Sequence, residues 1–296
     1  MIISHTSDIH LPLTFKPTIS SLFNKRVIGY INHNSNRRNV HKLENIELIL
    51  HDIKLKNKTG HTILSGDIVN LSLEEEFINA NEFLGKYFTK YNLSIIPGNH
   101  DAYVDIEYKN SLYHLANYLN ECDPLNQDST FPYIKKIKNI ALIGISTAVP
   151  SPPFMCWGRV SKEQLMKLEK ILSSIEKENN FVLLFLHHPI HHYGAFNHKG
   201  LLNKEELIET ISKFNIHLII HGHLHREIHN SIQIKDISVP CIGAPSGSRD
   251  KNSGLSYLEY QIDKINDNWN LKVYRREYNF TDEMFKSLIL KEVSYD

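Results

Sequence analysis

Short apolar runs that alternate with amphipathic stretches are the feature that most constrains the fold of this chain. Such runs are typical of buried strands in a parallel sheet, and apolar residues at helical spacing lie between several of them. A helix that connects two strands makes them parallel and brings their carboxyl ends to the same edge of the sheet. The strand-like runs are Met1 to Ser4, Thr62 to Leu64, Leu93 to Ile96, Phe181 to Leu186 and His217 to Ile220, and the helical stretches include Leu43 to Ile53 and Leu71 to Lys90.

Side chains of the kinds that bind metal ions follow each strand-like run. Because an open α/β sheet presents its chemistry at the carboxyl ends of its strands, we expect these side chains to meet although they lie far apart in the sequence. Taken alone, each segment has an ordinary interpretation as a helix cap, a turn, a loop or a buried, hydrogen-bonded histidine. Together they are enough for a two-metal hydrolytic site. The set comprises Asp8 and His10, Asp67, Asn99 with His100, His187, and His223 with His225.

Two of these segments share a local pattern. In an extended segment, residues i and i+2 point to the same side, so Asp8 and His10 present a carboxylate and an imidazole together. His223 and His225 present two imidazoles in the same way. Gly66 precedes the next carboxylate and lets the backbone turn sharply at the end of its strand.

Composition narrows the class of protein. With 296 residues, of which 41% are hydrophobic, the chain can bury a full core, and we expect a single domain over 1–296. A formal net charge of zero gives no strong sign of nucleic-acid binding. The cysteines, Cys122, Cys156 and Cys241, form no CxxC pair, which argues against a disulfide framework and a thiolate zinc site. We expect a cytoplasmic protein, because there is no signal-peptide pattern and no apolar run of the roughly 20 residues that span a membrane.

The last part of the chain predicts two strands and a helix. Tyr257 to Ile262 and Trp269 to Tyr274 flank an Asn-Asp-Asn turn and predict an antiparallel hairpin. Residues from about Asp282 to Val293 show the spacing of a helix. We expect this hairpin and helix, over 255–294, to complete a second sheet behind the motif-bearing region 1–250.

The motifs DxH, GD, GNHD, H and GHxH occur in that order, and this order resembles the calcineurin-like metallophosphoesterase family, of the bacterial cytoplasmic phosphodiesterase type. The match runs from Asp8 to His225, and every motif is intact. The resemblance implies an α/β fold, a four-layer α-β-β-α sandwich in which two mixed β-sheets are flanked by helices.

The resemblance also implies which residues hold two divalent metal ions. The first ion would be bound by Asp8, His10, Asp67 and His225, and the second by Asp67, Asn99, His187 and His223, with Asp67 bridging. His100 would lie beside the substrate phosphate without binding metal, and Asp101 would orient it, so these two are the candidate catalytic residues. His187 is preferred to His188 because the family places the first histidine of such a pair at the metal. Mn and Fe suit these donors best, and Zn, Ni or Co also suit them.

By the same resemblance, we expect a phosphoric ester hydrolase that acts on a small-molecule phosphate ester. Two ions hold more positive charge than the ligand carboxylates offset, which attracts phosphate and makes a bridging hydroxide available for in-line attack. His100 can stabilise the charge that develops and protonate the leaving oxygen. A phosphodiesterase is the first expectation. The alternatives are a pyrophosphatase acting on a lipid-linked diphosphate such as UDP-2,3-diacylglucosamine, and a non-catalytic metal-binding scaffold.

Two segments are candidates for substrate selection. Residues 9–43 contain six basic residues, no acidic one and many apolar ones, so 11–40 is a candidate lid or insertion, a peripheral membrane contact, or ordinary packing on the domain. The proline-rich loop Thr147 to Arg159 either lines a pocket mouth or packs beneath a long loop. The sequence leaves the substrate, the native metals and the oligomeric state open.

Overall fold

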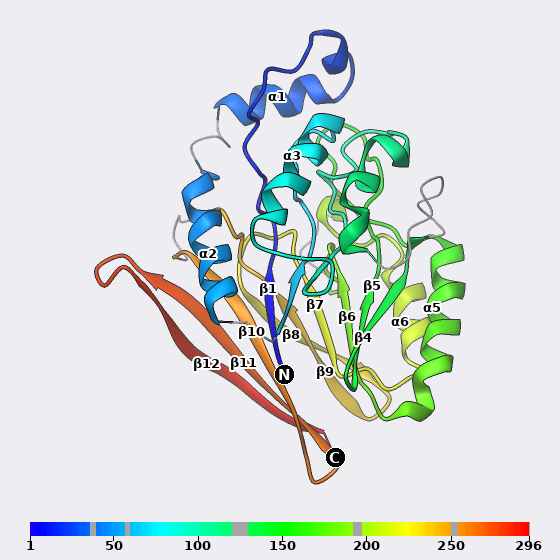
Figure 1. The fold of residues 1–296 in the computed structure, drawn as a ribbon. Helices are drawn as coiled ribbons and strands as arrows, with labels where there is room; N and C mark the ends of the chain where they lie inside the picture. Colours follow the sequence, from blue (N-terminus) through cyan, green and yellow to red (C-terminus); the bar gives the residue numbers. More distant parts are fainter. Residues whose placement is uncertain (36–39, 57–59, 120–129, 192–196, 250–253, 296) are drawn as a thin grey trace.

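Two six-stranded sheets and the helices outside them form the four layers expected from the sequence (Figure 1). The computed structural model describes residues 1–35, 40–56, 60–119, 130–191, 197–249 and 254–295. One apolar core contains residues from both sheets and from the helices over the first sheet, and a second core lies between the second sheet and its helices. The fold is therefore an α-β-β-α sandwich of two mixed sheets.

The first sheet has the strand order β12-β11-β10-β1-β2-β3. Strands β1 (Ile2–Thr6), β2 (His61–Leu64) and β3 (Leu93–Ile95) are parallel to one another. Helix α2 (Leu43–Lys56) connects β1 with β2, and α3 (Glu74–Gly85) connects β2 with β3. The carboxyl ends of these three strands therefore lie at one edge, as the sequence predicts.

The second sheet has the order β4-β5-β6-β7-β9-β8. Strands β5 (Ile140–Gly144), β6 (Phe181–Leu186), β7 (Leu218–His221) and β9 (Ile237–Gly243) are parallel, while β4 (Tyr133–Ile137) and β8 (Ile228–Ile234) are antiparallel edge strands. Helices α5 (Lys162–Ile175) and α6 (Lys204–Ile211) cover the outer face. Short 3₁₀ helices complete the regular structure, namely η1 (Ser20–Leu22), η3 (Tyr108–Asn110), η4 (Leu112–Tyr118), η5 (Glu176–Glu178) and η6 (Asn197–Lys199).

The C-terminal region confirms the hairpin and corrects two other expectations, because its strands extend the sheet of β1 instead of completing the second sheet, and the predicted helix is a strand. Strands β10 (Ser256–Ile265) and β11 (Asn268–Asn279) join through Asn266 and Asp267, whose positive φ values of 50° and 67° are those of a tight hairpin turn. The predicted helix is instead β12 (Met284–Tyr295), which pairs antiparallel with β11. Its register with β11 shifts next to Val273, so the simple alternation of a strand is interrupted and the apolar spacing imitates a helix.

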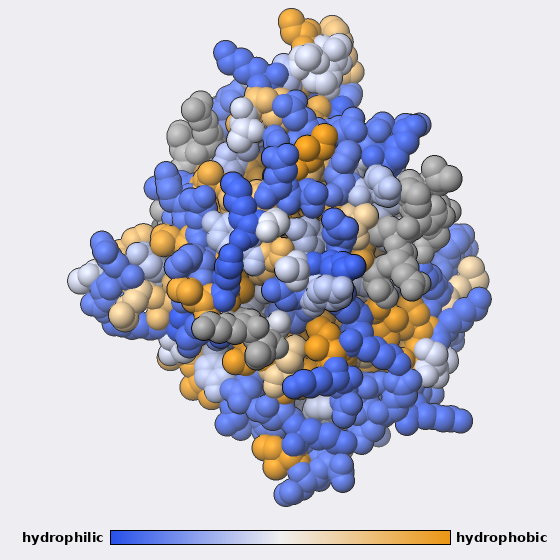
Figure 2. Space-filling model, viewed as in Figure 1, coloured by the Kyte–Doolittle hydropathy of each residue, from blue (hydrophilic) through white to orange (hydrophobic). Residues whose placement is uncertain are grey.

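The segment before α2 stands apart from the two cores. Helix α1 (Arg26–Ser35) and η1 lie above the carboxyl edge of the sheets, at the end of the molecule away from both chain termini (Figure 1). A small apolar cluster holds the segment through Leu71, Leu73 and Tyr103. Apolar side chains gather at the outer tip over this segment (Figure 2), where Ile19 and Phe23 are 78% and 81% exposed.

Residues 36–39 of the candidate lid and Cys122 lie outside the described residues. Within the described residues, every helix is too short or too polar to cross a membrane.

Candidate metal centre

The candidate ligands lie in loops at the carboxyl ends of five strands, which come from both sheets. The structure brings all of these side chains together at the edge that the sequence predicts. Asp8 and His10 follow β1, Asp67 follows β2, Asn99 and His100 follow β3, His187 follows β6, and His223 and His225 follow β7.

One group of side chains gathers around Asp8. Its Oδ1 lies 3.2 Å from Nε2 of His225, which in turn lies 3.4 Å from Nε2 of His10. Oδ2 of Asp67 lies 3.7 Å from Nε2 of His10. One ligand atom from each of these four residues lies within 4.8 Å of the others. This span is close to that of a single ion, because opposing ligands with bonds of about 2.1 Å lie about 4.2 Å apart.

A second group lies on the other side of Asp67. Nε2 of His187 lies 3.5 Å from Oδ1 of Asp67 and 3.3 Å from Oδ1 of Asn99. The His223 ring packs edge-on against the His187 ring, with 5.1 Å between the ring centroids. Asp67 therefore turns one carboxylate oxygen towards each group, which is the position that a bridging ligand needs.

The hydrogen bonds of His187 orient it towards this centre. Its Nδ1–H donates to the carbonyl oxygen of Ser65 at 2.7 Å, so the lone pair of Nε2 faces Asp67. Metal-binding histidines are commonly held in this way. The neighbouring His188 instead has Nδ1 2.8 Å from Oγ1 of Thr147, in the proline-rich loop. One ring nitrogen of His188 also lies within 4.8 Å of nitrogens of His187 and His223, so the choice of His187 stays a prediction.

Unsatisfied polar atoms at the centre give an independent test of whether metal ions fit. Both ring nitrogens of His223 are buried and have no hydrogen-bond partner among the residues that the structure describes. Leaving a buried polar group unsatisfied costs about 1–3 kcal/mol. A divalent ion would satisfy such a nitrogen, and the imidazole, carboxylate and amide donors without thiolate suit first-row transition metals. The residues present therefore fit the metal ions that the sequence implies.

The backbone at the candidate ligands corrects one prediction, because the DxH and HxH segments are not extended. Left-handed φ values are uncommon outside glycine and cost about 1–3 kcal/mol each. Hydrogen bonds between the loops hold these conformations, since Asp8 N donates to Gly66 O at 2.9 Å and His10 N donates to Asp67 O at 3.0 Å. The ligands thus face one another through tight turns. Asp8, His10, Asp67, His223 and His225 have φ values of 53°, 42°, 54°, 70° and 53°.

Gly98 allows the two sheets to approach at the centre. A Cβ atom there would lie 2.3 Å from Oδ1 of Asp67 and 2.7 Å from Cε1 of His187. A larger residue would push these two side chains away from each other. The glycine of the GNHD motif is therefore needed for close approach.

Burial and mutual charge determine the protonation of the metal-free centre. Burial opposes the charge on His187, but the Asp67 carboxylate beside it outweighs this effect and raises the pKa of His187 to about 9. Burial alone would raise the pKa of Asp67, whereas His187 and His100 hold it well below its usual value. Burial lowers the pKa of His223 well below the usual value, so this imidazole is neutral and ready to bind a cation.

His100 lies in the pocket wall beside the candidate ligands. Its backbone N–H donates to Oδ1 of Asp67 at 2.7 Å, and its Nδ1–H donates to the carbonyl oxygen of Asn70 at 2.7 Å. The Tyr103 ring stacks on the imidazole with 5.2 Å between centroids and an 11° angle between planes. The ring is therefore held in a fixed orientation, with Nδ1 rather than Nε2 bonded to the backbone.

Asp101 makes different contacts from those the sequence suggests. Its carboxylate accepts backbone N–H groups of Ile68 and Val69, both at 2.9 Å, and of Gly98 at 2.7 Å. Burial, followed by repulsion from Asp67, raises the pKa of Asp101 to about 7. Asp101 thus joins the two loops that carry Asp67 and Asn99, whereas the carbonyl group of Asn70 orients the His100 ring.

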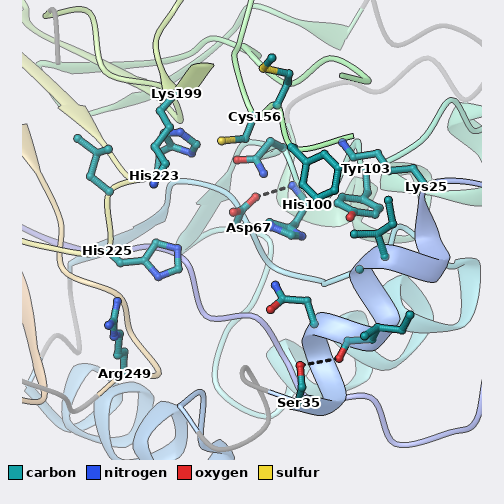
Figure 3. Close-up of a pocket in the computed structure, with 18 residues that line it drawn as sticks. Lys25, Ser35, Asp67, His100, Tyr103, Cys156, Lys199, His223, His225 and Arg249 are labelled. Atoms are coloured by element: carbon teal, nitrogen blue, oxygen red, sulfur yellow. Dashed lines mark hydrogen bonds between the residues drawn. The ribbon is translucent and has the colours of Figure 1, made fainter. Parts of the chain in front are cut away.

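A cavity of about 790 Å³ opens over the centre. Asp67, His100, His223 and His225 face it, with Lys199 and Arg249 at its periphery (Figure 3). Helix α1 and the proline-rich loop form much of the remaining wall. Both segments that the sequence singled out for substrate selection therefore line the same cavity. Their lining residues are Lys25, Ile28, Gly29, Ile31, Asn32 and Ser35 from the first segment, and Phe154, Met155 and Cys156 from the second.

The two wall segments are joined by a lysine that sequence reasoning did not single out. Lys25 Nζ donates to the carbonyl oxygen of Ser151 at 2.9 Å and to its Oγ at 3.1 Å. The same ammonium group lies 4.3 Å from the centre of the Tyr103 ring, which stacks on His100. No local motif marks this role, because the partners lie more than seventy positions away.

Comparison with known proteins places the chain in a family. Residues 1–227 match the family model of the calcineurin-like phosphoesterases. The chain is similar to a protein from Colwellia psychrerythraea described as a probable cyclic nucleotide phosphodiesterase, with 25% identity over 222 residues, 73% of each chain. Its fold is similar to the crystal structure of a dimetal phosphatase from Danio rerio, with a TM-score of 0.62, 12% identity and coverage of 99% of this chain and 98% of the other. The family match spans most of the chain and includes all the candidate ligand loops, and the protein is a phosphoric ester hydrolase of the calcineurin-like phosphoesterase family.

Proposed function

We propose that this protein hydrolyses phosphodiesters with two divalent metal ions. The observation that carries the proposal is the position of Asp67, whose two carboxylate oxygens lie 3.7 Å from His10 and 3.5 Å from His187. A carboxylate shared by two groups of ligands is what a dinuclear centre requires. A storage site has no need of a single shared carboxylate beside an open cavity.

Seven residues would hold the two ions. When bound, the ions would polarise the phosphate and lower the pKa of water for attack on phosphorus. Their identity stays open among the first-row metals, with Mn and Fe as the first expectation. Asp8, His10, Asp67 and His225 would form one position, and Asp67, Asn99, His187 and His223 the other.

His100 would act on the substrate rather than on the ions. Because Nδ1 donates to Asn70 O, Nε2 is the nitrogen that would contact a phosphate oxygen and protonate the departing alcohol. Asp101 would support the centre through its three backbone contacts, which hold the loops of Asp67 and Asn99 in register.

The cavity supports a diester rather than a small monoester. Its volume of about 790 Å³ exceeds what a phosphate group fills, and Ile28, Ile31 and Phe154 add an apolar wall. A substrate with an organic group on each side of the phosphate would use that wall. Residues 11–35 would then act as a fixed cap that selects the second ester group. Cys156 and Cys241 form no disulfide bond within the described part of the chain, and a cytoplasmic location stays a proposal.

A lipid-linked diphosphate is a second candidate substrate, because Ile19 and Phe23 expose large apolar surfaces next to the cavity wall. The basic residues give it less support than the sequence suggested. Lys25 donates to Ser151, and Arg26 Nε donates to Leu71 O at 2.8 Å, so both cations are engaged within the fold. Flotation with liposomes that contain anionic lipid tests this candidate, and absence of binding would rule against it.

Hydrolysis of bis(p-nitrophenyl) phosphate by the Mn-loaded protein tests the leading proposal. We expect His100→Ala to keep both ions but lose about 10²–10⁴-fold in turnover, as for other general acids. Asp67→Ala should lose metal as well as activity. His114→Ala is the matched control, because this histidine contacts Glu74 and lies outside the cavity wall. Full activity in both the His100 and Asp67 variants would contradict the proposal.

A further inference from the structure

We propose that His41 is a further metal ligand, which adds a third imidazole to the position formed by Asp8, His10 and His225. This inference rests on the proposed function, because it concerns the same dinuclear centre. His41 precedes α2 and belongs to none of the motifs that mark the other ligands.

The geometry of three imidazoles is the first argument. The His41 ring lies 4.7 Å from the His10 ring and 5.5 Å from the His225 ring, edge-on to both. One ring nitrogen from each of the three lies within 4.8 Å of the others. Ligands on opposite sides of one ion lie about 4.2 Å apart, so a shift of a few tenths of an ångström would bring all three nitrogens to one ion.

The hydrogen bonds of His41 are the second argument. Its Nδ1 lies 2.6 Å from Oγ of Ser248. That hydroxyl group lies 3.2 Å from the carbonyl oxygen of Asp8 and donates to it, so it accepts the Nδ1–H of His41. The lone pair is therefore on Nε2. Metal-binding histidines usually have the Nδ1–H fixed by a polar partner in this way and bind the ion through Nε2.

The backbone keeps His41 next to the first ligand loop. Lys42 N donates to Ser248 O at 3.2 Å, and His41 forms a bridge with Arg249. Oγ of Ser246 donates to the carbonyl oxygen of Asp8 at 2.7 Å. Since the same serine-rich turn binds both segments, an ion held by Asp8 lies within reach of the imidazole of His41.

The position of His41 argues against a direct role in substrate binding. The residue is 7% exposed and lies outside the set of residues that line the described cavity. Its contacts are with the ligands instead. With His41 included, the first position would have three imidazole nitrogens and the second would have two, together with an amide oxygen. Nitrogen-rich sites favour Zn, Ni, Co or Fe over Mg or Ca, so the two positions should differ in metal preference.

The test is His41→Phe, which keeps an aromatic ring against His10 and His225 but has no nitrogen to bind metal. The readouts are metal content after dialysis in chelator-buffered Co²⁺, the affinity of each bound ion, and the visible absorption spectrum of the Co²⁺-loaded protein. We expect one of the two ions to bind about 10–100-fold more weakly, and the absorption bands to change in position and intensity.

His61→Phe is the matched control. His61 is also buried and lies 2.8 Å from a serine hydroxyl, that of Ser94, but it begins β2 at the end away from the ligands. The His61→Phe variant should retain the affinity for both ions and the absorption spectrum. If His41→Phe does not fold, Ser248→Ala decides the question, because it removes only the partner of Nδ1 and should weaken the same ion about tenfold.

The outcomes separate this inference from the proposed function. If His41→Phe binds two ions tightly and its spectrum is unchanged, the role of His41 alone is overturned. If that variant does not fold, the same result in Ser248→Ala overturns it. A wild-type protein that fails to bind two ions would instead overturn the dinuclear centre. Weakening of one ion with the altered spectrum, absent in His61→Phe, would support the inference.

Discussion

Metal binding should release a proton from His187, and the pH dependence of that release follows from the geometry. Nδ1–H of His187 is engaged with Ser65 O, so the additional proton of the metal-free protein is on Nε2, 3.5 Å from Oδ1 of Asp67. Nε2 is also the atom proposed to bind metal. An ion must therefore displace this proton, and its apparent affinity is reduced while the proton is present.

The magnitude follows from the raised pKa of His187, about 9. At pH 7 only about 1% of the imidazole is neutral, so the ion should bind about 100-fold more weakly than at high pH, a difference of about 2.7 kcal/mol. The affinity should rise about tenfold for each pH unit up to pH 9. The stability of the metal-free protein changes with pH in the opposite direction. A raised histidine pKa stabilises the folded state at low pH, and this contribution is lost as the pH rises through 9.

Calorimetric titration of metal into metal-free protein, in paired buffers of different ionisation enthalpy, counts the protons released. We expect about 0.9 proton from His187 at pH 8 and about 0.5 at pH 9. Asp101, whose pKa is raised to about 7, contributes little in that range. If the released protons came from metal-bound water instead, their number would rise with pH, which is the opposite trend. The reasoning is refuted if the proton count at pH 8 is near zero, or if the His187 imidazole titrates below pH 7 in NMR spectra of the metal-free protein.

Three substitutions test other parts of the centre and the fold. Gly98→Ala should weaken metal binding at least about tenfold, because the added methyl group would lie 2.3 Å from Oδ1 of Asp67; unchanged metal content after dialysis would contradict this. Asp101→Asn should lower the free energy of unfolding by about 1–3 kcal/mol, because its amide group would face a buried backbone N–H; a change below about 0.5 kcal/mol in urea titrations would argue otherwise. Arg276→Lys should cost about 1–3 kcal/mol, because lysine has one nitrogen and cannot keep both the Nε contact with Asp52 Oδ2 at 3.2 Å and the Nη2 contact with Oδ1 at 2.9 Å; equal urea midpoints would count against it.

The buried strands and the meeting of the ligands were predictable from the sequence because both depend on local pattern and chain topology. Strand β6 shows the reason. Phe181, Leu183 and Phe185 pack in the core between the sheets, and the alternate residues pack under α5 and α6, so the run is apolar throughout. Parallel strands then bring their carboxyl ends to one edge, whatever the distance in sequence. That is why loops after β1 and β7 meet at Asp8 and His225.

The C-terminal strand was not predictable in the same way. Phe285 and Leu290 in β12 both pack against the core although they are five positions apart, which a regular strand does not allow. The register shift opposite Val273 changes the direction of the side chains. Only the partner strand shows that shift, so the sequence of this segment alone resembles a helix.

The position of the cavity wall was predictable from the sequence, but its chemistry was not. Acid-free residues 9–43 suggested a cationic surface, yet the structure engages Lys25 with Ser151 and Arg26 with carbonyl groups after β2. These bonds join segments 126 and 45 positions apart, and no local pattern encodes such distances. The α1 side chains that line the cavity are the apolar Ile28 and Ile31 and the polar Asn32 and Ser35. Lys25 and Arg26 therefore hold the wall in place, and under the proposed function the shape of the organic group attached to the phosphate would decide which substrate the cavity accepts.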